Sequence, residues 1–147
     1  GPRFYLRGAG GSKLEAHLMS EGMRKLASIL RLLQNGELRS TGLLLWDEPE
    51  ANLNPHLTVL VARALARLAA NNVQVVIATH DYLLTETLAL LARQARTKFE
   101  LRYFAFERKD DDTSVTVSAA DRLNDLAVNP IRDEFLAHYD RVRGIED

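Results

Sequence analysis

Two short apolar runs, each ended by polar residues and joined by one amphipathic stretch, constrain the fold of this chain most. The first run, 43–46, is followed by Asp47 and Glu48, and the second, 73–79, is followed by His80. Short unbroken runs of this kind are typical of strands that are buried on both faces, and such strands belong to parallel sheets. We therefore expect two parallel strands, each covered on both faces.

The stretch between the two runs has the pattern of a helix. Asn54 is a favourable N-cap, Pro55 suits the first helical position, and Asn71-Asn72 ends the periodicity. The expected buried stripe is Leu57, Leu60, Val61, Ala64, Leu65 and Leu68, with Arg63 and Arg67 opposite. A second helix is expected after 73–79, with apolar Leu83, Leu84, Leu88 and Leu91. Strand, helix, strand, helix with short connections predicts the α/β class, with right-handed βαβ units of a doubly wound sheet.

The segments before this unit are less regular. Residues 3–7 suit a short strand and 8–12 a Gly-rich turn or linker, while Gly1-Pro2 resembles the remnant of a cleaved purification tag. Helical periodicity runs from Leu14 to Leu33 and stops at Asn35-Gly36. Ser20 is a good N-cap inside it, so the helix starts either near Leu14 or at Ser20, with 14–19 then a separate turn or loop.

The segments after the unit predict a hairpin and a last helix. Alternating residues at 99–106 and 114–118 flank an acidic loop at 109–112. Asn129-Pro130 can cap and restart a helical segment. Its apolar face would comprise Phe135, Leu136, Tyr139 and Val142.

Composition excludes several classes of protein. The chain has 147 residues, 46% hydrophobic, with 19 basic and 20 acidic side chains and no cysteine, which suits one compact domain without disulfides or thiolate zinc sites. No apolar run approaches the roughly 20 residues of a membrane span. We expect a cytoplasmic protein with no membrane partner. The basic excess in residues 1–40, 7 basic against 3 acidic, is typical of an ordinary solvated surface.

Asp47 and Glu48 are the first candidates for chemistry, because open α/β sheets bind ligands at the carboxyl ends of their strands. Asp47 suits Mg²⁺, which prefers carboxylate oxygen, and Glu48 suits the polarisation of an attacking water. A polar turn at a strand end would have the same composition.

Two further groups favour the functional interpretation. His80 ends the neighbouring strand, where it can hydrogen-bond a terminal phosphate or the attacking water. Upstream, Ser20-Glu21-Gly22 precedes a long helix, and a hydroxyl, a glycine and free N–H groups at a helix N-terminus form a phosphate-binding surface.

In this order the residues resemble the C-terminal half of an ABC-type ATPase head, a partial P-loop NTPase fold. Residues 19–22 resemble the signature motif, 43–48 the Walker B strand, 51–54 the D-loop, and His80 the switch histidine. The resemblance covers 14–95, with 96–147 as hairpin and helix of the same domain. The residues that this sequence has at these motifs are most similar to those of soluble ATPases of the RecF, SMC and OLD groups and of related bacterial AAA ATPases, including some from phage defence.

The resemblance implies a role for each residue. Asp47 would support Mg²⁺, Glu48 would act as general base, and His80 would sense the γ-phosphate of ATP. Ser20 and Gly22 would bind the γ-phosphate of a nucleotide held by the opposite protomer, so hydrolysis would need a head-to-head homodimer. Asn54, where the family usually has Asp, would cross that interface. Neither Glu50 nor Trp46 is assigned a role in the site, and Trp46 is expected in the core.

The sequence departs from the family in one respect, since it contains no Gly-x-x-x-x-Gly-Lys-Ser/Thr. Residues 8–13 have glycines and a lysine but not that ending. We expect the Walker A lobe to lie outside these 147 residues or on another polypeptide, and this chain alone to hydrolyse no ATP. An apolar sheet edge would then be exposed.

The process that ATP hydrolysis drives is expected to be DNA repair, DNA maintenance or phage defence, with DNA or a nuclease as partner. Two alternatives remain open. One is a catalytically silent interaction module that keeps the fold, and the other is a Toprim-like magnesium nuclease. The second is weaker because the acidic cluster at 110–112 has the pattern of a solvated hairpin loop.

Overall fold

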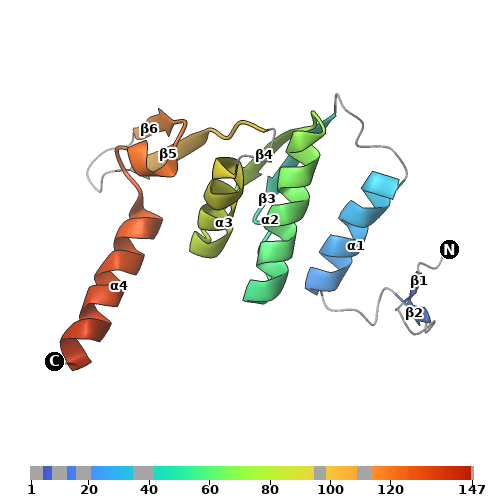
Figure 1. Cartoon of the computed structure of the whole chain (residues 1–147), viewed down its shortest axis with the longest axis horizontal. Helices are drawn as coiled ribbons and strands as arrows, with labels where there is room; N and C mark the ends of the chain where they lie inside the picture. Colours follow the sequence, from blue (N-terminus) through green and yellow to red (C-terminus); the bar gives the residue numbers. More distant parts are fainter. Residues whose placement is uncertain are drawn as a thin grey trace.

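The computed structural model of the chain describes residues 5–7, 13–15, 21–34, 42–94, 99–108 and 114–146. The elements follow in the order β1 (Tyr5–Arg7), β2 (Lys13–Glu15), α1 (Glu21–Gln34), β3 (Leu43–Asp47), α2 (Pro55–Ala70), β4 (Gln74–Ala78), α3 (Tyr82–Arg93), β5 (Tyr103–Arg108), β6 (Val115–Ala120), the 3₁₀ turn η2 (Leu123–Asp125) and α4 (Pro130–Glu146). The helices and strands mix as the sequence predicts, and the fold class is α/β (Figure 1).

A parallel pair of strands forms the centre of the fold. β3 and β4 are in register from Leu43 beside Gln74 to Asp47 beside Ala78. The backbone N–H of Gln74 extends this ladder by donating to Gly42 O (2.9 Å). α2 connects the two strands, so β3, α2 and β4 form the predicted βαβ unit.

The core lies between this sheet and the helices. Val61, Ala62 and Leu65 of α2 pack with Leu84 and Leu88 of α3. Partly buried side chains of both strands pack against this cluster, namely Leu44, Trp46, Val75 and Ile77. Trp46 is therefore a core side chain, as expected.

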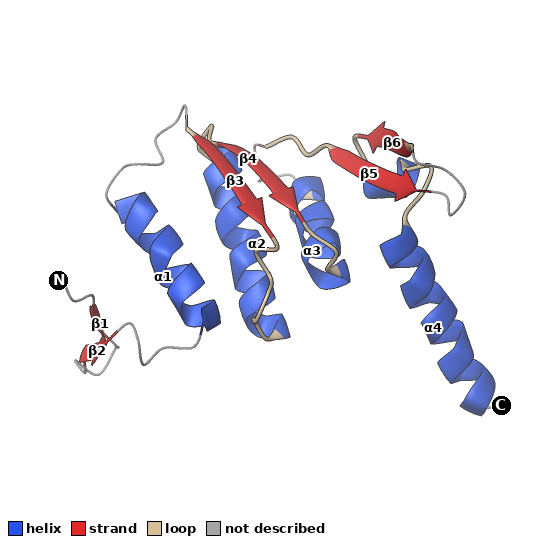
Figure 2. Cartoon of the chain, turned by 180° about the vertical axis from the view of Figure 1, so that it is seen from behind, coloured by secondary structure: helices blue, strands red, loops and turns tan. Residues whose placement is uncertain are grey.

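The other face of the sheet corrects one expectation. Leu43 is 55% exposed, Leu45 67% and Val76 48%, so the two strands are not buried on both faces within the described part of the chain. α1, α2 and α3 lie on one face only, and the β3–β4 face in front of them in Figure 2 is open. An unbroken apolar run gives no information on which layer covers its second face, which explains the error.

Two details of the helical and N-terminal predictions were also wrong. Leu60 is 40% exposed rather than part of the buried stripe, because α2 packs on α3 through Val61, Ala62 and Leu65. Residues 13–15 form β2, antiparallel to β1 with Tyr5 beside Glu15, where the sequence indicated a linker and a turn, loop or helix start. A three-residue strand is too short for a period of two to be recognised.

The helix ends agree with the sequence. Asn54 caps α2 through its Oδ1, which accepts from Leu57 N (2.9 Å), and Pro55 is the first helical residue. α1 begins at Glu21, directly after the predicted cap Ser20, which itself lies outside the described residues. Asp81 caps α3 by accepting from Leu84 N (2.6 Å).

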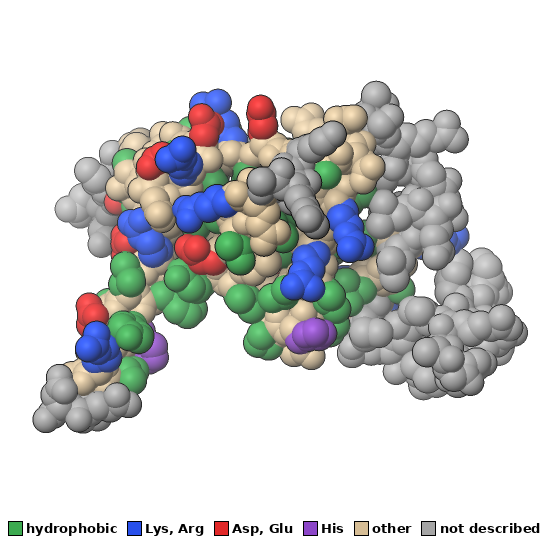
Figure 3. All heavy atoms as spheres, viewed as in Figure 1, with side chains coloured by type: hydrophobic (Ala, Val, Ile, Leu, Met, Phe, Trp, Pro, Cys, Tyr) green, Lys and Arg blue, Asp and Glu red, His purple; other side chains and the backbone are tan. Residues whose placement is uncertain are grey.

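The C-terminal part forms the predicted hairpin and helix. β5 pairs antiparallel with β6, from Tyr103 beside Ala120 to Arg108 beside Val115, and β5 starts later than the expected 99. The acidic cluster at 110–112 lies outside the described residues. In α4, hydrophobic side chains remain exposed (Figure 3), namely Phe135, Leu136, Tyr139 and Val142. None of the described helices combines the length and apolarity that a membrane crossing requires.

Candidate active site

One end of the molecule collects the chemically reactive residues. β3 and β4 point toward this end, and the N-termini of α1, α2 and α3 lie there too (Figure 2). Helix N-termini carry partial positive charge and free N–H groups, which favour anions such as phosphate. This end therefore suits a phosphorylated ligand.

Glu48 follows the last residue of β3 in an unusual backbone conformation. Its φ of 45° lies in the left-handed region, which is uncommon for a residue other than glycine. Its backbone N–H donates to Ala78 O of the neighbouring strand (2.8 Å), and its carbonyl accepts from Ala51 N (3.1 Å). A conformation that costs about 1–3 kcal/mol persists only where the surroundings hold it, and such residues cluster at functional sites.

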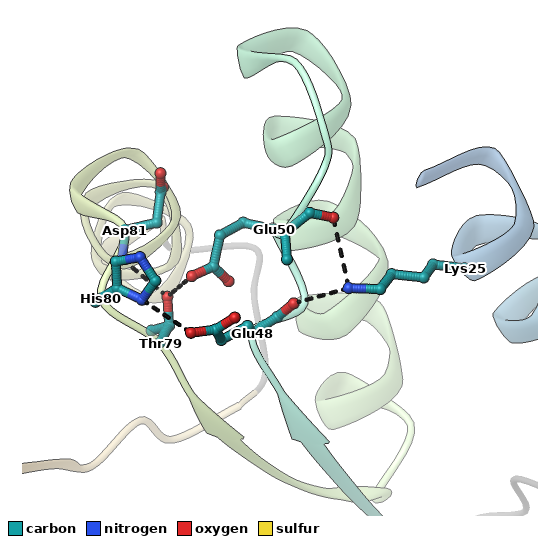
Figure 4. A network of polar contacts seen from close by, with 7 residues as sticks. Lys25, Glu48, Glu50, Thr79, His80 and Asp81 are labelled. Carbon is teal, nitrogen blue, oxygen red and sulfur yellow. Dashed lines mark hydrogen bonds and ion pairs between the residues drawn. The ribbon is translucent and has the colours of Figure 1, made fainter. Parts of the chain in front are cut away.

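The side chain of Glu48 meets His80. His80 Nδ1 lies 3.3 Å from Glu48 Oε1 (Figure 4). The two side chains are 77% and 50% exposed, and an exposed pair of this kind contributes little to stability. The pair therefore places an acid and an imidazole side by side at the open edge of the sheet, where both remain accessible to a ligand.

Behind this pair lies a second, partly buried contact. Glu50 is only 8% exposed, and its Oε1 accepts a hydrogen bond from Thr79 Oγ1 (2.6 Å). The Thr79 hydroxyl in turn accepts from the backbone N–H of Asp81 (3.1 Å). Glu50 Oε2 is buried and has no hydrogen-bond partner among the described residues. The turn after β3 is thus joined to the residues that flank His80.

Lys25 of α1 holds the same turn from the other side. Its Nζ donates to the carbonyl oxygens of Glu48 (3.4 Å) and Ala51 (3.5 Å), both long hydrogen bonds (Figure 4). An ammonium group next to two carbonyls stabilises the turn through its donors and its charge. α1 is thereby tied to the loop that carries Glu48.

Gly22 makes the close approach of α1 possible. It is buried, and a Cβ atom at this position would lie 2.7 Å from Asn52 O and overlap the side chain of Leu53. Asn52 has a φ of 63°, which asparagine tolerates better than most residues. The N-terminus of α1 therefore packs directly on the 51–54 loop.

The remaining predicted site residues are placed as follows. Asp47 is exposed at the end of β3, and no hydrogen bond or ion pair engages its carboxylate within the described ranges. Asn54 is exposed and caps α2. Ser20 lies outside the described residues, although Glu21 begins α1 beside this end. The structure thus brings Glu48 and His80 into contact and leaves Asp47 and Asn54 at neighbouring strand and helix ends.

The site is open, and its described residues provide too few ligands to hold a metal ion by themselves. In the described part of the chain, no group of three or more His, Asp or Glu side chains is arranged to hold a metal. Asp47 alone nevertheless fits the way Mg²⁺ binds with nucleotides, through one or two carboxylates together with phosphate oxygens and water. A shallow hollow elsewhere lies on α3, lined by residues that include Glu86, Leu90 and Arg93, and does not reach Glu48 or His80.

Sequence reasoning missed three contributors to the site: Lys25, Glu50 and Thr79. Glu50 had no assigned role, and Thr79 was only the end of a strand. A second acid after Asp47-Glu48 and a hydroxyl directly before His80 were visible signals, but their contact spans 29 positions in sequence.

One protein family matches most of this region. Residues 4–86 match the family described as "AAA domain, putative AbiEii toxin, Type IV TA system", which is more than half of the chain and includes every candidate site residue. The chain belongs to this AAA family. Glu48, His80 and their neighbours therefore lie in an ABC-type, AAA-like ATPase domain, of a family that hydrolyses nucleotides.

A solved structure supports the fold of this AAA-family chain. A chain from work on ATP-driven dimerization and DNA-stimulated activation of SMC ATPases matches with a TM-score of 0.57 and 14% sequence identity. The match covers 80% of the AAA-family chain and 64% of the SMC chain, so this chain spans less than two thirds of that relative. No curated protein matches its sequence. This structural similarity supports a partial P-loop NTPase-like fold for the chain.

Proposed function

We propose that this chain is the C-terminal part of an ATP-hydrolysing head in which Glu48 is the general base. The observation that carries the proposal is the contact of Glu48 with His80 at the ends of two parallel strands, with Glu48 in a left-handed conformation. A carboxylate at this position can accept a proton from a water that attacks the γ-phosphate. His80 can donate to a γ-phosphate oxygen while it contacts Glu48.

Asp47 would hold Mg²⁺ in this head. Its exposed carboxylate fits the metal's preference for oxygen ligands, and the N-termini of α1, α2 and α3 would face the negative phosphates (Figure 2). When bound, Mg²⁺ would neutralise the charge of the β- and γ-phosphates.

The Walker A loop would come from outside these 147 residues. The sequence contains no Gly-x-x-x-x-Gly-Lys-Ser/Thr, and the exposed face of β3 and β4 offers an apolar surface for another layer. We expect the isolated chain to show no magnesium-dependent ATP turnover. Turnover by the purified chain would contradict this part of the proposal.

The active unit would be a head-to-head homodimer. Ser20 and Gly22 would meet the γ-phosphate of a nucleotide held by the opposite protomer, and Asn54 would lie at the interface. The SMC relative, described by ATP-driven dimerization and DNA-stimulated activation, supports this arrangement and a DNA partner. The process served would then be DNA repair, DNA maintenance or phage defence, and a nuclease would be a further partner. Duplex DNA should raise turnover of the full-length protein, and this effect should weaken with salt.

Glu48→Gln in the full-length protein tests the general base. Because the amide cannot accept the proton, turnover should fall by about 100- to 10,000-fold, while ATP binding persists and light scattering detects an ATP-trapped dimer. Glu100→Gln, which changes an exposed acid outside the site, is the matched control and should leave turnover unchanged. Unchanged turnover in Glu48→Gln would refute the assigned base.

A further inference from the structure

Glu50 is an unusual residue to find behind an active site, because a buried carboxylate normally has several hydrogen-bond partners. This one is more than nine-tenths buried, accepts one hydrogen bond, from Thr79, and has a second oxygen without a partner among the described residues. Burial of a charge with so few partners is costly, so packing alone does not account for a glutamate here.

The contact joins the two strand ends that carry the reacting side chains. Glu50 lies two residues after Glu48, and Thr79 lies directly before His80. The short 2.6 Å hydrogen bond therefore fixes the turn after β3 to the end of β4. The Thr79 hydroxyl also accepts from Asp81 N, so both neighbours of His80 are held while its own side chain remains 77% exposed.

We propose that Glu50 is a positioning residue for His80: its buried carboxylate, through the Thr79 hydroxyl, sets the place of the imidazole opposite Glu48. This inference rests on the proposed function, in which Glu48 and His80 act in ATP hydrolysis. Glu50 acts through Thr79 and touches neither Glu48 nor His80 by any described hydrogen bond. For this role Glu50 must accept a hydrogen bond at Oε1, but it need not accept a proton.

The first experiment measures the position of His80 without any turnover. In the full-length protein labelled at histidine, the ring signals of His80 are identified by their loss in His80→Gln. Thr79→Val and Glu50→Leu should shift these signals, because each removes one partner of the hydrogen bond. Thr79→Ser and Glu50→Gln keep a hydroxyl and an acceptor oxygen, and should retain the wild-type signals.

The matched control is Thr85→Val. Thr85 is also partly buried near the start of α3, and its hydroxyl donates to Asp81 O and Tyr82 O, but it does not contact Glu50. Loss of the Thr85 hydroxyl should leave the His80 signals in place. Equal shifts in Thr85→Val and Thr79→Val, or no shift in Thr79→Val, would overturn the proposal. If Thr79→Val does not fold, Thr79→Ala and Glu50→Leu provide the same comparison.

The second experiment measures ATP turnover of the same variants. Thr79→Val should lower kcat by about 10- to 100-fold, as expected for a misplaced catalytic group, with KM for ATP nearly unchanged. In a His80→Ala background the same change should cause no further loss, because residues that act through one another are not additive. An equal loss in both backgrounds would contradict positioning through His80.

Glu50→Gln separates positioning from proton transfer. It should keep most of the turnover, whereas Glu48→Gln should lower turnover by about 100- to 10,000-fold. A loss in Glu50→Gln as large as in Glu48→Gln would make Glu50 a reacting group and refute this inference alone. Full turnover in Glu48→Gln would instead refute the proposed function, and the His80 signals would still decide the positioning role.

Discussion

At the scale of single residues, the site depends on a few positions where the backbone or the side chain departs from the ordinary. Glu48 has a φ of 45°, Gly22 allows no Cβ, and Glu50 is a buried acid. All three lie on or against the turn that follows β3. Residues with such strained or unusual geometry cluster at functional sites, so this turn is where the proposed chemistry is best tested.

Gly22→Ala should loosen the contact between α1 and the 51–54 loop. The added methyl would lie too close to the backbone carbonyl of Asn52, so the helix or the loop must shift, at a cost of about 1–3 kcal/mol. Urea unfolding measures this loss. Gly144→Ala is the matched control, because a Cβ at this exposed helical position meets nothing within 4 Å. It should stabilise the chain slightly, and equal effects of the two changes would contradict the packing argument.

Tyr103 makes stability depend on pH at the alkaline end. Burial, with repulsion from Glu86, raises the pKa of its phenol to about 12 from 10.0, although Arg93 opposes the shift. A raised pKa means that the folded state holds the proton more tightly, so this contribution to stability is fully present below about pH 10 and is lost as pH rises toward 12. Absorbance titration at the tyrosinate band should locate this transition, and Tyr103→Phe should remove it. A midpoint at the value of free tyrosine would contradict the burial of the ring.

At the scale of the elements, the parallel pair and its three helices form a platform with one reactive end. α2 and α3 start with Asn54 and Asp81 as N-caps, so each begins directly after the loop that carries site residues. Lys25 of α1 reaches the same loop. The caps therefore fix where the functional loops end, and the helices behind them provide the rigid support that a site needs.

Asn54 tests this coupling between cap and loop. Asn54→Ala removes the acceptor for Leu57 N and should cost about 1 kcal/mol of stability in urea unfolding. Asn54→Asp keeps an equally good cap and restores the charge that the ABC family usually has here, so it should leave the unfolding midpoint unchanged. Equal losses in both variants would show that the cap is not what the side chain contributes.

At the scale of the whole molecule, helices cover only one face of the β3–β4 sheet within the described part of the chain. The β3–β4 face with Leu43, Leu45 and Val76 is exposed, and so is the apolar face of α4. These two apolar faces leave surface on which a further layer or a partner can pack.

Self-association of the 147-residue chain should follow from the open sheet face. Light scattering should give a mass above that of a monomer, because a contiguous exposed apolar face favours association with a second copy. Leu45→Glu should reduce this association. Leu90→Glu changes a leucine of similar exposure, 59%, on α3 and is the matched control. If the unmodified chain is a monomer, or if both changes have equal effects, the sheet face is not the surface through which the chain associates.

Much of this fold could be predicted from the sequence, because its determinants are local. Local determinants of a few neighbouring residues encode the apolar runs of β3 and β4, the cap Asn54 and the end of α1 before Asn35. The same holds for the order of the candidate site residues, which indicates the ATPase family from the sequence alone. Segments as short as β2 carry too few residues for such a signal.

The tertiary structure alone decided what holds the site together. Glu50 meets Thr79 and Lys25 meets Ala51 across 29 and 26 positions of sequence, and no local pattern encodes such contacts. The open face of the sheet was likewise invisible in the sequence, because an apolar strand looks the same whether or not a second layer covers it. The sequence by itself determined the longer elements, their order and the choice of Glu48 and His80 as candidate site residues. Packing, which depends on distant residues meeting in space, decided the conformation of Glu48, the burial of Glu50 and the face left uncovered.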